Sequence, residues 1–72
     1  MIRKISTYYS DYDKGHCDVM LDLKEEIFFI EYYDNNGKML FTEEFPNKSM
    51  NYVEDAAENW ALGIKKLAEN AF

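Results

Sequence analysis

Residues Phe41–Ala71 read FTEEFPNKSMNYVEDAAENWALGIKKLAENA, and the spacing of the apolar residues changes at Pro46 within this stretch. Before Pro46 the pattern is typical of β-strands, and after it the apolar residues recur at helical spacing. Pro46 itself ends a strand, because proline has no N–H to donate to a β-ladder. The change therefore predicts strands up to Pro46 and one amphipathic helix after it.

The helix is expected over about 51–71. Asn51 is a good N-cap residue, and Glu54 three positions later completes a capping box. The apolar stripe at helical spacing consists of Val53, Ala56, Ala57, Trp60, Ala61, Ile64, Leu67, Ala68 and Ala71. We expect Trp60 to be the largest buried residue of the helix, packed over the inward residues of the second strand, Cys17, Val19 or Leu21.

The first 45 residues contain four runs with the composition and alternation of β-strands, separated by short polar breaks. The expected strands are Ile2–Ser10, His16–Leu23, Ile27–Tyr33 and Met39–Phe45. A chain of 72 residues makes one domain, 1–72. The expected fold class is α+β, a four-stranded antiparallel β-meander followed by one C-terminal α-helix packed on one sheet face.

The break Asp34–Lys38 predicts a tight hairpin. Asp at its start, Asn in its middle and Gly near its end fit a type I turn closed by a G1 bulge, and a two-residue type I′ turn at Asn-Gly is the alternative. The choice matters because a shift of one residue moves every side chain of a strand to the other face. The bulged turn predicts the pairs Tyr33–Met39 and Glu31–Phe41.

The chain is acidic, with a net charge of −6 and a pI of about 4.6. Nucleic-acid affinity rests on Lys and Arg that neutralise phosphates, so we expect no nucleic-acid partner. The spread of acidic residues favours a solubilising surface, and mimicry of a polyanion is the alternative. The longest apolar run, Ile27–Ile30, is too short to cross a bilayer, so we expect no membrane partner. One thiol and no export signal predict a cytoplasmic location.

Cys17 and His16 are the single cysteine and the single histidine. One cysteine excludes an intramolecular disulfide and a paired-cysteine zinc site. Neighbours in a strand point to opposite faces, so His16 is not placed to activate Cys17, which we expect to be a small buried residue. Asp11-x-Asp13-x-Gly15 resembles the start of a calcium loop but lacks the remaining ligands. We expect no catalytic residue, no cofactor, no metal and no enzymatic activity.

The third strand is apolar on both faces, although one helix covers only one face of a sheet. Some of its aromatic side chains must therefore be exposed or covered by another chain. The bulged-turn register predicts an interface formed by Phe29, Tyr33, Phe41 and Phe45, and the alternative register brings Phe28, Ile30 and Tyr32 there instead. We expect a small non-enzymatic protein-interaction protein that self-associates as a homodimer. The alternative is an acidic inhibitor that mimics nucleic acid and occupies a basic site on a host enzyme.

Two stretches, EEFPNKS (Glu43–Ser49) and VEDAAENWALGIK (Val53–Lys65), resemble small uncharacterised proteins of tailed phages, of the kind found in marine cyanophages. The resemblance extends over Tyr32–Leu67. It implies a phage accessory protein that acts in the cytoplasm of a bacterial host, and it implies no functional residues.

Overall fold

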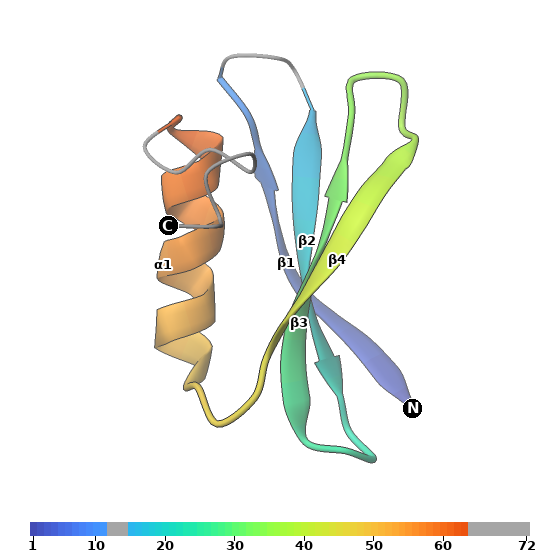
Figure 1. Ribbon diagram of the computed structural model, residues 1–72, viewed down its shortest axis with the longest axis vertical. Helices are drawn as coiled ribbons and strands as arrows, with labels where there is room; N and C mark the ends of the chain where they lie inside the picture. The colour runs from blue at the N-terminus through green and yellow to red at the C-terminus, as the bar shows by residue number, and fades with distance from the viewer. Residues whose placement is uncertain (12–14, 64–72) are drawn as a thin grey trace.

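A computed structural model describes residues 1–11 and 15–63. The chain forms a four-stranded antiparallel sheet in the order β1-β2-β3-β4, followed by one helix that packs on one face of the sheet (Figure 1). The elements are β1 (Ile2–Tyr9), β2 (His16–Asp22), β3 (Ile27–Tyr33), β4 (Met39–Phe45) and α1 (Met50–Ala61). The predicted α+β meander is confirmed.

The N-cap of the helix lies two residues earlier than predicted. Ser49 is the N-cap, with an extended backbone and a side-chain oxygen that accepts from the N–H of Tyr52 at 3.2 Å. Asn51 lies inside the first turn, so its prediction as the N-cap is wrong. The link after Pro46 turns sharply at Asn47, where φ is +63°, and it is Ser49 that then adopts the conformation of a cap.

At its other end α1 stops at Ala61, so the prediction of a continuous helix through Gly63 is wrong. Gly63 has a φ of +81° and donates its N–H to Trp60 O at 3.0 Å, which is how glycine commonly ends a helix. The Ala61 carbonyl accepts from the N–H of Asp11 at 3.0 Å, so the loop after β1 satisfies one of the last carbonyls of the helix. The predicted helical residues 64–71 lie outside the described part of the chain.

The β3–β4 hairpin has the predicted type I turn with a G1 bulge. Gly37 donates to Asp34 O at 3.0 Å with a φ of +83°, and Asp34 N donates to Lys38 O at 2.9 Å. Asn36 does not have the positive φ that a type I′ turn requires. The Asp34 carboxylate accepts from the N–H groups of Lys38 and Asn36, which lowers the pKa of this carboxyl.

The register of β4 differs from the prediction one residue after this turn. Tyr33 pairs with Met39 as predicted, but the ladder then shifts, so that Tyr32 pairs with Phe41. Leu40 is the extra residue of this bulge, and Glu31 consequently faces Thr42. The predicted pair Glu31–Phe41 is therefore wrong, and every later residue of β4 lies on the face opposite to the one expected.

The core lies between α1 and the sheet face that it covers. Its buried members are Cys17, Val19, Ile30, Tyr32, Phe45, Val53, Ala57, Trp60 and Ala61. Trp60 is the largest buried residue of α1, as predicted, and shares this core with Cys17 and Val19, whereas Leu21 is half-buried. Its ring meets that of Tyr32 edge-on, with centroids 5.2 Å apart.

Candidate functional site

No described element packs on the sheet face opposite α1, which we call the open face. The strand register places its side chains in four rows that cross the sheet. From one end to the other, the rows are Tyr9, His16, Tyr33 and Met39; then Thr7, Asp18, Glu31 and Thr42; then Lys4, Met20, Phe29 and Glu44; and finally Ile2, Asp22 and Ile27. Apolar and aromatic side chains therefore occupy both ends, and the second row is polar throughout.

The predicted interface residues divide between the two faces. Phe29 and Tyr33 lie on the open face and are half-buried. Phe41 and Phe45 lie on the covered face, which contradicts their predicted placement. The bulge at Leu40 is the cause: it turns Phe45 into the core and brings the ring of Phe41 to 4.9 Å from that of Tyr32, centroid to centroid. Phe28, Ile30 and Tyr32, the alternative set, also lie on the covered face.

The predicted interface set left out several side chains of the open face, namely Ile2, Tyr9, His16, Met20 and Ile27. Alternation in β2 and β3 places His16, Met20 and Ile27 on this face, and that signal was available. Alternation along β1 could not place Ile2, because a bulge between Lys4 and Ser6 changes the face of the residues that precede it.

The polar row is bonded within the chain. Asp18 is only 6% exposed, accepts from the Thr7 hydroxyl at 2.7 Å and lies 3.5 Å from the Lys4 ammonium group. Glu31 accepts from the Tyr33 hydroxyl at 3.0 Å. Desolvation and this hydrogen bond raise the pKa of Tyr33. A second surface placed on the open face would therefore not leave these carboxylates without partners.

Three rings form a continuous row at the end of the open face near the β3–β4 turn; we call them the ring row. His16 stacks on Tyr33 with centroids 4.6 Å apart and planes 8° apart, and Tyr9 lies against the other side of His16 at 5.8 Å. Tyr9 is 73% exposed, although it is aromatic. The ring row therefore presents flat apolar surface and hydroxyl groups to the outside.

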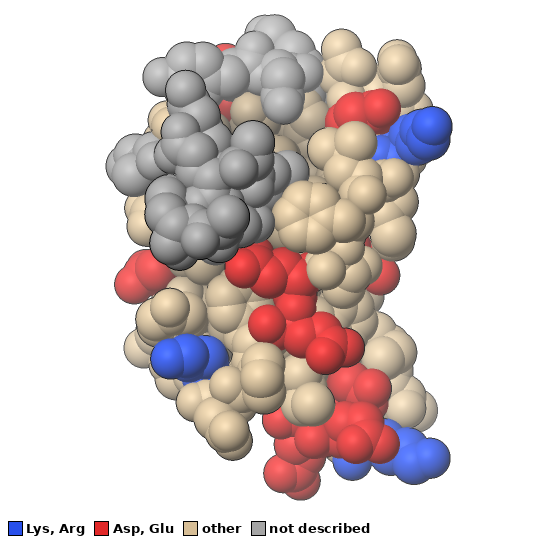
Figure 2. Space-filling model, viewed as in Figure 1, with Lys and Arg blue, Asp and Glu red and all other residues tan. Residues whose placement is uncertain are grey.

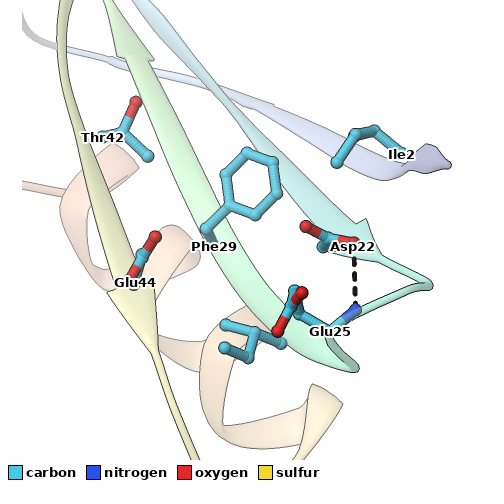
Figure 3. Close-up of a pocket in the computed structure, with 7 residues that line it drawn as sticks. Ile2, Asp22, Glu25, Phe29, Thr42 and Glu44 are labelled. Atoms are coloured by element: carbon cyan, nitrogen blue, oxygen red, sulfur yellow. Dashed lines mark hydrogen bonds between the residues drawn. The ribbon is translucent and has the colours of Figure 1, made fainter.

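The opposite end of the open face is hollowed (Figure 3). The hollow has a volume of about 220 Å³ and an apolar lining of Ile2, Ile27 and Phe29. Figure 3 shows Phe29 between Ile2 on one side and Thr42 and Glu44 on the other. Its remaining lining residues are polar or acidic: Asp22, Glu25, Thr42 and Glu44. The Asp22 carboxylate also accepts from the backbone N–H groups of Lys24 and Glu25 in the β2–β3 turn, at 3.0 and 3.2 Å. The hollow thus combines an apolar floor with a carboxylate rim that contains no Lys or Arg.

On the covered face, side-chain hydrogen bonds join α1 to β1 and β3 to β4. Glu54 accepts from the hydroxyl of Ser6 at 3.0 Å and from that of Tyr8, and its hydrogen bond raises the pKa of Tyr8 to about 12. The Tyr32 hydroxyl donates to Glu43 at 2.9 Å, and burial followed by this bond raises the pKa of Tyr32. The bonds of Glu54 position the helix on β1, and the bond of Tyr32 joins β3 to β4.

Cys17 is fully buried on the covered face. Burial, and then the charge of Asp18, raise the pKa of its thiol to about 12, so the thiolate that nucleophilic chemistry requires is scarce near neutral pH. His16 lies on the open face, away from this thiol, as alternation predicted. Cys17 therefore acts as a small core residue.

Within residues 1–11 and 15–63, no group of three or more His, Cys, Asp or Glu side chains is arranged to hold a metal ion. Asp13 of the calcium-like pattern lies outside that part of the chain. The helix of the described structure is not long and apolar enough to cross a membrane. No family model, curated protein or solved structure matches the chain, so the resemblance to tailed-phage proteins stays a prediction.

Proposed function

We propose that this is a non-enzymatic protein-interaction protein that self-associates through the open face. The observation that carries the proposal is the composition of that face. Its two ends are apolar or aromatic, no described element packs on it, and the carboxylates in its polar row are bonded within the chain. A surface with these properties loses water favourably without breaking hydrogen bonds.

The size of the open face sets the expected strength of the dimer. Four strands at about 4.8 Å spacing and seven residues at about 3.3 Å per residue give a flat area of roughly 440 Å². Two copies would bury about 900 Å² in total, which is below the range of about 1,200–2,000 Å² for stable interfaces. The dimer should therefore dissociate on dilution.

Sedimentation equilibrium over a range of protein and salt concentrations tests the proposal. We expect the average mass to rise from monomer to dimer with concentration. Added salt should favour the dimer, because each copy carries a net charge of −6 and salt screens the repulsion. A monomer at the highest protein and salt concentrations would refute self-association.

A second function is favoured by the distribution of charge. Figure 2 shows Asp and Glu gathered in a band from the middle of the molecule toward the end with the β2–β3 turn. Such a band favours an acidic inhibitor that occupies the nucleic-acid site of a basic host enzyme. Titration into a fluorescent duplex bound to a nucleic-acid enzyme of the host tests this, because a mimic releases the duplex. Unchanged anisotropy across a panel of such enzymes would exclude it.

With either function, the phage resemblance supports an accessory role in a host cytoplasm.

A further inference from the structure

The two ends of the open face differ in shape and chemistry. The ring row, Tyr9, His16 and Tyr33, crosses β1, β2 and β3 at one end, and the hollow crosses the same strands at the other end. Six residues of β3 separate Tyr33 from Ile27, a distance of about 20 Å along the strand. A row of rings at one end and a hollow at the other can meet the same two features of a second copy that is turned end to end.

We propose that a second copy covers the open face with its strands antiparallel to those of the first, so that each ring row lies on the hollow of the other copy. This arrangement rests on the proposed self-association and specifies its geometry. The two-fold axis crosses the strands at mid-face, between the row of Asp18 and the row of Phe29. The interface is isologous, so the contact between ring row and hollow occurs twice, once for each copy.

The facing pairs are chemically compatible. Tyr33 lies over Ile27 of the second copy, next to Phe29, and Tyr9 lies over Ile2. His16 lies over Asp22, so its ring N–H can donate to a rim carboxylate, and the Tyr9 hydroxyl can do the same. The hollow has a volume of about 220 Å³ and an apolar floor, which gives room for part of an aromatic ring.

The centre of the interface supports the same orientation. Lys4 of one copy lies over Thr7 of the other, beside Asp18, so each of the two ammonium groups lies near the Asp18 carboxylate of the facing copy. Each Lys4 therefore offsets part of the acidic charge at the centre, while Glu31 lies over Phe29 and Glu44 over Thr42, so that no two carboxylates face each other directly.

The other aligned arrangement has its axis parallel to the strands and places β1 over β4 of the second copy. It superposes one hollow on the other, so that the rim carboxylates of Asp22, Glu25 and Glu44 from both copies meet. It also sets Asp18 opposite Glu31 twice. Like charges brought together in this way repel, and this selects the antiparallel arrangement.

Cross-linking between engineered thiols tests the orientation. Tyr9→Cys combined with Ile2→Cys puts thiols on residues that face each other only in the antiparallel arrangement. Tyr9→Cys combined with Met39→Cys puts thiols on residues that face each other only in the arrangement with its axis parallel to the strands. All three side chains are exposed, which limits damage to the fold. A bismaleimide reagent of about 10 Å matches the spacing of packed sheets, and the buried Cys17 of the unmodified protein provides the background.

We expect a covalent dimer from the first pair and none from the second or from either single variant. Tyr9→Ala should also raise the dimer dissociation constant about tenfold, whereas Tyr52→Ala, which removes an exposed ring on α1, should leave it unchanged. A covalent dimer from the second pair, or an unlinked first pair in a sample that sediments as a dimer, overturns the orientation and leaves self-association standing. A wild-type protein that sediments only as a monomer overturns both.

Discussion

Replacing Trp60 with Ala should remove about 4 kcal/mol of the free energy of unfolding. A Trp side chain buries up to about 250 Å², and only 7% of Trp60 is exposed. At about 25 cal/mol per Å² this area is worth at most about 6 kcal/mol, and large aromatic residues replaced by Ala typically cost about 3–5 kcal/mol. The edge-on contact with Tyr32 is lost as well. A chain of 72 residues has a total stability of only about 4–11 kcal/mol, so the loss is a large share of it.

Urea unfolding followed by far-ultraviolet circular dichroism measures this loss, since the variant has no tryptophan left for fluorescence. Tyr52→Ala is the matched control, because it removes another ring from α1 that is 51% exposed. Tyr52→Ala removes the contacts of this ring with Phe45 and Lys48. It should lower the free energy of unfolding by less than about 1 kcal/mol. Both variants are compared at one low protein concentration, so that dimerisation does not contribute.

Two results would refute the reasoning. An unfolding midpoint of Trp60→Ala equal to that of the wild type would mean that Trp60 is not part of the core. Equal losses in both variants would mean that burial does not distinguish the two rings.

Three further predictions concern single residues. Cys17 should react slowly with a thiol reagent in the native state and rapidly in urea, because it is fully buried and its pKa is raised to about 12; fast native labelling would contradict this. Stability should fall as the pH rises from about 10 to 12, because the folded state raises the pKa of Tyr8 and favours its protonated form. Tyr8→Phe should weaken that fall, as measured by urea midpoints across pH. Gly37→Ala should lower the free energy of unfolding by about 1–2 kcal/mol, because Gly37 has a φ of +83°. This backbone strain is the whole cost, since an added Cβ meets no atom within 4 Å, and an unchanged melting temperature would exclude it.

The parts of the fold that follow from local signals could be predicted from the sequence. The bounds of β3 and β4 match the prediction, and the turn between them has the expected type, because Asp34, Asn36 and Gly37 determine the turn through their own backbone preferences. The helix cap could not be chosen locally. Ser49 and Asn51 are about equally good N-caps, and the conformation of the preceding link decides between them.

The faces of Phe41 and Phe45 depend on the core rather than on local sequence. Burying a phenylalanine side chain is worth about 1.5–3 kcal/mol, whereas a bulge disturbs a ladder whose hydrogen bonds contribute about 0.5–1.5 kcal/mol each. The gain from placing Phe45 in the core therefore outweighs the irregularity at Leu40. A strict alternation along β4 could not reveal this, because both faces of the strand contain apolar and acidic residues.

The same bulge determines what kind of surface the open face is. With Phe41 and Phe45 turned to α1, β4 contributes only Met39, Thr42 and Glu44 to the open face. The row of Asp18 and Glu31 then separates the aromatic end from the hollow, so the apolar surface is divided into two small areas. Divided apolar areas favour contact in one orientation and disfavour indiscriminate aggregation, which a continuous aromatic face would promote. A β4 without the bulge would have placed two more phenylalanines there and removed them from a core that a domain of this size cannot spare. The irregular strand therefore serves the stability of the fold and the selectivity of the proposed interface together.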